Sequence, residues 1–229
     1  MTKILFGTLA FMVVLGHSNL TLGQPPQTIA LWTFEPDPLA VNLTNNTIGP
    51  SILPPAGGSG SLIGTHASSA TVWSTPSGNG SSNALSVNTW AVGDYWQFLI
   101  STTNYTSINM SWDQTRSSTG VTNFTVRYSL DGTSFTSFTN YSVNAVTWNS
   151  TTATNTSSFS YSFSSVPLLE NQTSVYFRLV GEQTPAASGT GRIDNVLFTG
   201  VIPEPSSAML FGLGALAYIG MRAMGRKQS

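Results

Sequence analysis

The chain has 229 residues, of which 40% are hydrophobic and only 7% charged, and its formal net charge is -1. Because about a quarter of the residues in an ordinary soluble domain are charged, Ser, Thr, Asn and Gly must supply most of the polar surface here. The near-neutral balance argues against nucleic acid as a partner. The absence of cysteine excludes disulfides, thiolate metal sites, iron–sulfur clusters and cysteine nucleophiles.

The first 23 residues have the pattern of an export signal. One positive charge, Lys3, precedes an apolar run over residues 4–15, and polar residues from His17 onward close that run. About a dozen residues at about 1.5 Å each are too few to cross about 30 Å of hydrocarbon. We therefore predict a signal peptide over residues 1–23, with an internal start helix as the alternative.

Residues 25–200 are expected to form one all-β domain. Apolar and polar residues alternate there with the period of a half-buried strand, most clearly at Ile108/Met110/Trp112, Phe124/Val126/Tyr128, Phe159/Tyr161/Phe163 and Val175/Phe177/Leu179. The dipeptide Asp131-Gly132 favours a tight hairpin, because glycine permits a positive φ. No window of a dozen residues keeps a helical apolar stripe. We predict a jelly-roll-like β-sandwich of about eight to eleven strands.

Ionisable residues are rare in this domain. Its four basic residues are Arg116, Arg127, Arg178 and Arg192, and the eight acidic residues exceed them by four. The domain's single histidine, His66, lies in a polar segment, and no Gly-x-Ser-x-Gly motif accompanies it, so a catalytic triad is not expected. Nothing matches the Glu-x-Asp-x-x-Glu run of β-sandwich laminarinase-like enzymes. We therefore predict that the domain is not an enzyme.

The two ends of the domain resemble the terminal strands of carbohydrate-binding-module-type jelly rolls. The segments that carry this resemblance are residues 31–37 and 191–198. The resemblance implies that Glu35 and Asp194 help to hold a structural calcium ion, with carbonyls and water completing a shell of six to eight oxygens. The alternative is that Asp194 pairs with Arg192 or caps a turn while Glu35 is solvated.

All six tryptophans fall in the domain. Exposed indole rings can stack on the C–H faces of sugars. Trp90 and Trp148 lie in loop-like segments and are the candidates for ligand binding, whereas Trp32 and Trp112 fit strand patterns and are expected in the core. The alternative is that the whole set is buried, because indoles also dominate the cores of β-sandwiches.

The last 27 residues, 203–229, combine three features in order. An apolar segment over residues 208–221 separates a proline-rich motif from a basic tail; the motif is Pro203, Glu204 and Pro205, and the tail charges are Arg222, Arg226 and Lys227. This order resembles the PEP-CTERM protein-sorting signal of Gram-negative bacteria. The resemblance implies export, anchoring in the inner membrane by a short transmembrane helix, and cleavage by an exosortase. A plain membrane anchor without processing is the alternative.

These patterns predict an exported protein of the cell surface or the extracellular polysaccharide matrix, with a structural or adhesive role. A carbohydrate-binding module with a structural calcium ion is the second hypothesis. A glycan-degrading enzyme is the third, and the missing catalytic constellation makes it the weakest of the three.

Overall fold

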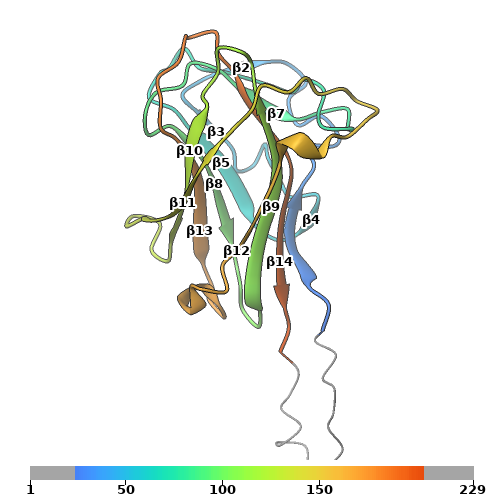
Figure 1. The fold of residues 1–229 in the computed structure, drawn as a ribbon, viewed down its shortest axis with the longest axis vertical. Coiled ribbons are helices and arrows are strands. Elements are labelled where there is room, and N and C mark those ends of the chain that lie inside the picture. Colours follow the sequence, from blue (N-terminus) through green and yellow to red (C-terminus); the bar gives the residue numbers. More distant parts are fainter. Residues whose placement is uncertain (1–23, 204–229) are drawn as a thin grey trace, which may run out of the picture.

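The computed structural model describes residues 24–203 as two antiparallel β-sheets packed face to face (Figure 1). This architecture confirms the predicted all-β sandwich. The predicted signal peptide lies outside the described residues, and so does the predicted sorting signal from Glu204 onward, including Pro205, the apolar segment and the basic tail. Within residues 24–203, no helix is long and apolar enough to cross a membrane.

The larger sheet has eight strands. Its main path runs β12–β9–β14–β7–β6–β2, and β1 pairs with both β14 and β4. The bounds are β1 Gln27–Trp32, β2 Leu43–Thr44, β4 Gly57–Gly58, β6 Val72–Ser74, β7 Leu85–Val87, β9 Thr106–Arg116, β12 Ser158–Ser162 and β14 Gly191–Val201. Because β1 pairs with β14, the two ends of the domain lie side by side (Figure 1).

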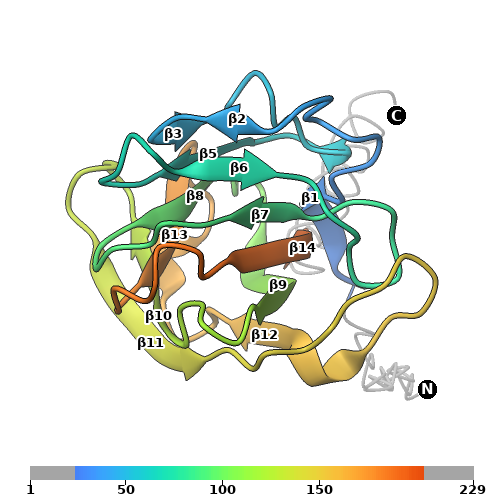
Figure 2. The same cartoon turned by 90° about the horizontal axis from the view of Figure 1, so that it is seen from above.

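The smaller sheet has six strands in the order β11–β10–β13–β8–β5–β3. Their bounds are β3 Thr47–Ile48, β5 Ser61–Thr65, β8 Tyr95–Ile100, β10 Asn123–Ser129, β11 Thr136–Ser142 and β13 Val175–Gly181. Two 3₁₀ turns, η1 at Asn155–Ser157 and η2 at Pro167–Leu169, lie in the connections before and after β12. Seen from above, β6, β7, β14 and β9 form one layer, and β5, β8 and β13 belong to the other (Figure 2).

The hairpin predicted at Asp131-Gly132 joins β10 to β11. Gly132 has a φ of 73°, a conformation that L side chains rarely adopt. The Asp131 carboxylate accepts the backbone N–H groups of Thr133 and Ser134 at 2.8 and 2.7 Å, which closes the turn. These hydrogen bonds hold the pKa of Asp131 well below its usual value.

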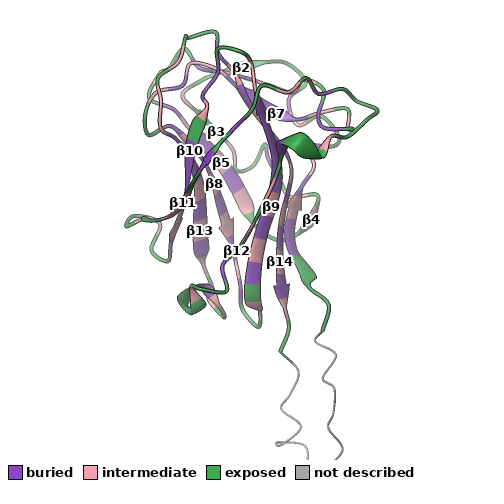
Figure 3. Cartoon of the chain, in the orientation of Figure 1, coloured by how far each residue is buried: buried purple, intermediate pink, exposed green. Residues whose placement is uncertain are grey.

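The core lies between the two sheets and is rich in aromatic rings. In β8, the side chains of Trp96, Phe98 and Ile100 are buried, while the alternate residues are half-exposed. β13 shows the same alternation from Val175 to Leu179, and β10 buries Phe124 and Val126. Buried positions line the strands of both sheets (Figure 3). Each large apolar side chain buried in this way contributes about 1.5–3 kcal/mol to folding.

The described residues form fourteen strands, which is more than the predicted eight to eleven. The excess comes from strands of only two or three residues, namely β2, β3, β4, β6 and β7. A strand this short contains no full alternation of apolar and polar residues, so its sequence carries no period to detect. The expected number was therefore wrong, although the fold class was confirmed.

Candidate functional site

Asp194 is fully buried and is bonded to the loop that connects β6 to β7. Its Oδ2 accepts the N–H of Asn79 at 2.9 Å and the Oγ–H of Ser81 at 2.6 Å, and its Oδ1 accepts the N–H of Asn195 at 2.8 Å. Burial raises the pKa of this carboxyl to about 6, although the three hydrogen bonds act in the opposite direction. No ion pair joins Asp194 to Arg192. The other form of the sequence-based alternative, in which Asp194 caps a turn, agrees with these hydrogen bonds.

Glu35 is bonded to the same loop at Asn83. Its Oε1 accepts the N–H of Asn83 at 2.7 Å, and its Oε2 accepts the side-chain amide of Asn83 at 2.8 Å. Glu35 and Asp194 thus brace one loop through N–H and O–H donors, which favour a carboxylate and oppose a cation in the same position. The described part of the chain contains no group of three or more His, Cys, Asp or Glu side chains that could hold a metal. A calcium ion at Glu35 and Asp194 therefore stays a prediction from the sequence.

The two tryptophans proposed as ligand-binding residues are both buried. Trp90 is 2% exposed, and its ring packs 4.5 Å from His66 and 4.7 Å from Trp96, measured between ring centroids. Trp148 is 5% exposed, and its indole N–H donates to Ser157 Oγ at 2.9 Å. The prediction of exposed rings was wrong, because the loops that carry them fold back onto the sandwich. Neither ring offers a free face for a sugar to stack on.

The predictions for the two other tryptophans were correct. Trp32 and Trp112 are 1% and 2% exposed and belong to the core. Each also satisfies its indole N–H within the protein: Trp32 donates to the carbonyl of Leu53 at 3.1 Å, and Trp112 donates to Gln114 Oε1 at 2.9 Å. Strand alternation therefore identified the core tryptophans, whereas a loop-like sequence did not identify exposed ones.

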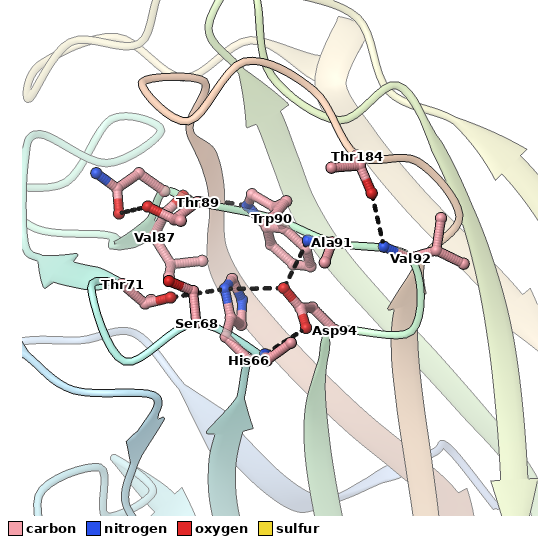
Figure 4. A network of polar contacts seen from close by, with 12 residues as sticks. His66, Ser68, Thr71, Val87, Thr89, Trp90, Ala91, Val92, Asp94 and Thr184 are labelled. Atoms are coloured by element: carbon pink, nitrogen blue, oxygen red, sulfur yellow. Dashed lines mark hydrogen bonds and ion pairs between the residues drawn. The ribbon is translucent and has the colours of Figure 1, made fainter.

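A buried polar network lies at one end of the sandwich (Figure 4). The Nδ1 atom of His66 lies 3.3 Å from Asp94 Oδ2 and 3.4 Å from Thr71 Oγ1. The Asp94 carboxylate also accepts the backbone N–H groups of Ala67 at 2.8 Å and Ala91 at 2.7 Å. Burial lowers the pKa of His66 to about 4 and raises that of Asp94, so the imidazole is neutral near pH 7. The His66 side chain has no solvent exposure, and it ties the loops together.

The outer face of the six-stranded sheet carries a groove of about 560 Å³, lined mainly by residues of β10 and β11. Hydroxyl, amide and charged side chains dominate its lining. Thr125 Oγ1 donates to Asn140 Oδ1 at 2.8 Å, and Arg127 Nη2 donates to Glu182 Oε1 at 2.9 Å. The groove therefore presents several hydrogen-bond donors and acceptors, held in place by their own contacts.

Arg178 lies beside this groove, directly opposite Arg127 in the register of β10 and β13. Its guanidinium carbon lies 3.8 Å from the centre of the Tyr95 ring and 3.6 Å from that of Phe135, and its Nε donates to Gln97 Oε1 at 2.8 Å. No carboxylate pairs with Arg178 in the described range. Burial lowers the pKa of Arg178, and the positive charge of Arg127 acts in the same direction. Like charges directly opposite each other destabilise a sheet, so this pair has a cost in the free protein.

The positions of Arg127 and Arg178 in their strand patterns indicate that both face away from the core, although the sequence analysis did not single them out. Arg127 lies between the apolar residues Val126 and Tyr128 of one predicted strand, and Arg178 lies between Phe177 and Leu179 of another. Side chains on a strand alternate between its two faces, so both arginines belong on the face away from the core. Their adjacency follows only from the pairing of β10 with β13, which a single sequence does not reveal.

The C-terminal end of the chain matches a known sequence motif, and the match covers only a small part of the chain. Residues 201–227 match the PEP-CTERM protein-sorting motif. The tail is a PEP-CTERM sorting signal. This match confirms the resemblance of the proline-rich motif, the apolar segment and the basic residues to that signal, and PEP-CTERM proteins are sorted for export. No curated protein sequence matches the chain.

Several solved structures are similar in fold to the chain. The CBM22-1–GH10 modules of a Clostridium thermocellum endo-1,4-β-D-xylanase, complexed with xylohexaose, share 14% identity at a TM-score of 0.43, covering 76% of this chain and 28% of that one. An adhesin domain of a Porphyromonas gingivalis Lys-gingipain shares 14% identity at 0.40, covering 75% and 98%. Carbohydrate-binding modules of the β-sandwich superfamily share 12% identity at 0.35, covering 73% and 60%. Values this low say nothing about the ligand or the site.

Proposed function

We propose that this protein is an exported, exosortase-sorted and non-catalytic β-sandwich of the cell surface or extracellular matrix, which adheres to polysaccharide. The PEP-CTERM motif over residues 201–227 supports the sorting step, with an exosortase and the inner membrane as partners during it. The observation that carries the adhesive role is the polar groove on the outer face of the six-stranded sheet, beside Arg178.

The groove has the chemistry of a sugar-binding surface. Its volume of about 560 Å³ lies within the roughly 300–1,000 Å³ usual for ligand sites. Sugars carry both donors and acceptors, and the groove offers both through Asn140, Thr125 and the Arg127–Glu182 pair. The rings of Tyr95 and Phe135 flank Arg178 next to it. A polar lining of this kind suits hydroxyl-rich chains and not an apolar ligand.

The same groove lacks the groups that glycoside hydrolysis requires. Glycosidases use two carboxyl groups on opposite sides of the scissile bond. Glu182 is the one carboxylate among the residues that line the groove, and it is bonded to Arg127. This arrangement supports binding without cleavage. A reducing-sugar assay that stays flat across a polysaccharide panel is the expected result, and release of reducing ends would contradict the proposal.

Affinity electrophoresis of the full chain tests the adhesive role. The protein is run in a non-ionic detergent without a sugar headgroup, through native gels that contain neutral or acidic polysaccharides. We expect at least one polysaccharide to retard the wild type, Asn140→Ala to reduce that retardation, and Asn144→Ala to leave it unchanged. Asn144 is the matched control because it is an exposed asparagine outside the groove. Equal migration in every gel would contradict the proposal.

A structural calcium ion at Glu35 and Asp194 is a separate proposal, derived from the sequence. It is tested by melting the full chain with calcium and with a chelator. A site held at a hundred times its dissociation constant stabilises the fold by about 2.7 kcal/mol, which moves the midpoint by several degrees. A shift that disappears in Glu35→Ala would support the ion. Identical midpoints in calcium and chelator would exclude it.

A further inference from the structure

The two remaining arginines of the domain, Arg116 and Arg192, line a second pocket on the opposite sheet. The pocket has a volume of about 290 Å³ and lies between β9, β14 and the segment 145–148, which follows β11. In the register of β9 and β14, Arg192 pairs with Thr115, the neighbour of Arg116. The residues that line the pocket include no carboxylate. Two positive charges thus face one small pocket without a negative charge among them.

The guanidinium of Arg116 is held by backbone carbonyls. Its Nε donates to the carbonyl of Val143 at 2.9 Å, and its Nη1 donates to those of Ser117 at 3.0 Å and Ser118 at 2.9 Å. These three acceptors are neutral, so they orient the group without cancelling its charge. Arg116 therefore forms a fixed, positively charged wall of the pocket.

The opposite wall is also anchored. Thr115 Oγ1 donates to the carbonyl of Val146 at 2.7 Å and accepts the N–H of the same residue at 2.9 Å. The indole of Trp148, which lines the pocket, donates to Ser157 Oγ at 2.9 Å. The segment that closes the pocket is consequently bonded to the sheet at one point and to the chain before β12 at another. A preformed site of this kind loses little conformational freedom when it binds a ligand.

Arg192 is the group in this pocket that lacks a partner. Its side chain is half-buried and makes no hydrogen bond or ion pair with any residue between 24 and 203. The carboxylate of Asp194, two residues along the same strand, is already bonded to Asn79, Ser81 and Asn195. Burial lowers the pKa of Arg192, and no nearby carboxylate offsets this effect. The domain has four more acidic than basic residues, so the missing partner does not reflect a shortage of carboxylates.

We propose that this pocket binds an anionic oxygen group, a carboxylate or a sulfate ester, carried on a saccharide. A guanidinium presents parallel N–H donors that match two oxygens of such a group. Hydroxyl side chains of Ser117 and Thr147 also line the pocket and can bond to sugar hydroxyls, while Trp148 and Val146 give it an apolar side. Its size suits about one sugar residue. The site lies on the other sheet from the proposed polysaccharide groove, so it stands independently of that proposal.

Isothermal titration of the full chain at low ionic strength tests this site. The probes are glucuronate, glucose 6-sulfate, inorganic sulfate and glucose. We expect the two acidic sugars to bind and glucose not to bind. Arg192→Gln should weaken acidic-sugar binding about tenfold or more, because a charge-assisted hydrogen bond is lost. Arg192→Lys keeps the charge without the fork and should give an intermediate loss. Lys227→Gln removes one positive charge from the C-terminal tail, which lies in neither proposed binding site, and should have little effect.

Three outcomes would overturn the proposal. Equal binding of glucose and glucuronate would remove the role of the anionic group. Binding of inorganic sulfate without either acidic sugar would reduce the pocket to a site for a free anion. An equal loss in Arg192→Gln and Lys227→Gln would show a net-charge effect with no local site. Circular dichroism of each variant confirms that it is folded, and the comparison of probes on the wild type needs no variant.

Discussion

The few charged side chains of this domain lie in two kinds of environment: the buried His66–Asp94 network, and the polar groove and second pocket with their arginines. In the network, the two ionisable side chains lie together, the imidazole is neutral near pH 7, and backbone amides satisfy the carboxylate. Arg178 beside the groove and Arg192 in the second pocket keep their charge, stay half-exposed and have no carboxylate partner in the described range. The contrast separates groups that stabilise the fold from groups left available to a ligand.

Removing the indole at the centre of the network is expected to have the largest effect on stability. The Trp90 ring contacts His66, Trp96 and Phe124, so Trp90→Ala leaves a cavity in the aromatic core. We expect a loss of about 3–5 kcal/mol in the free energy of unfolding, measured by urea denaturation of the full chain. A loss below about 1 kcal/mol, the size usual for surface substitutions, would mean that the network does not hold the loops in place.

The pH dependence of stability tests the network next. Because the pKa of His66 falls from 6.5 to about 4 on folding, its contribution is present above pH 6.5 and is lost as the pH falls through 4. The shift corresponds to about 3 kcal/mol. Asp194 acts in the opposite direction, since its raised pKa gives stability that is present below pH 3.8 and lost as the pH rises through 6. The contributions of His66 and Asp194 to the free energy of unfolding therefore change in opposite directions between pH 4 and 6.

The variant His66→Gln should reveal the contribution of Asp194 alone to the pH dependence of stability. Without the histidine, we expect the free energy of unfolding to decrease as the pH rises from about 4 to about 6, whereas the wild type should change much less. Urea denaturation at several pH values measures both slopes. A variant that becomes more sensitive to acid than the wild type would contradict the assignment of a neutral, buried imidazole.

In contrast to substitutions in the buried network, a substitution beside the groove is expected to have only a small effect on stability. Arg178→Gln removes a like charge opposite Arg127 but also removes the contacts with Tyr95 and Phe135. These effects oppose each other, and we expect the free energy of unfolding to change by less than about 1 kcal/mol. A loss as large as that of Trp90→Ala would place Arg178 among the residues that hold the fold.

The sequence predicted the fold where periodicity was strong and failed where tertiary packing decides. Alternating aromatic and β-branched residues identified the inner faces of β9, β10, β12 and β13 because these strands are long enough to show a period. The burial of Trp90 was predicted only as an alternative and that of His66 was not predicted, since both depend on loops folding over the end of the sandwich. Asp194 lies in β14, which pairs with β1, and Glu35 follows the end of β1. Asp194 bonds Ser81, a residue 113 positions away, and no local pattern indicates that contact.

The most direct test of the account is affinity electrophoresis of the full chain and its Arg178→Gln variant through gels that contain polysaccharide. The account predicts that the wild type is retarded by at least one polysaccharide and that Arg178→Gln migrates faster in the same gel, while the two proteins unfold at similar urea concentrations. Equal retardation of both proteins, or no retardation of the wild type in any gel, would contradict the claim that the outer face of the six-stranded sheet binds glycans.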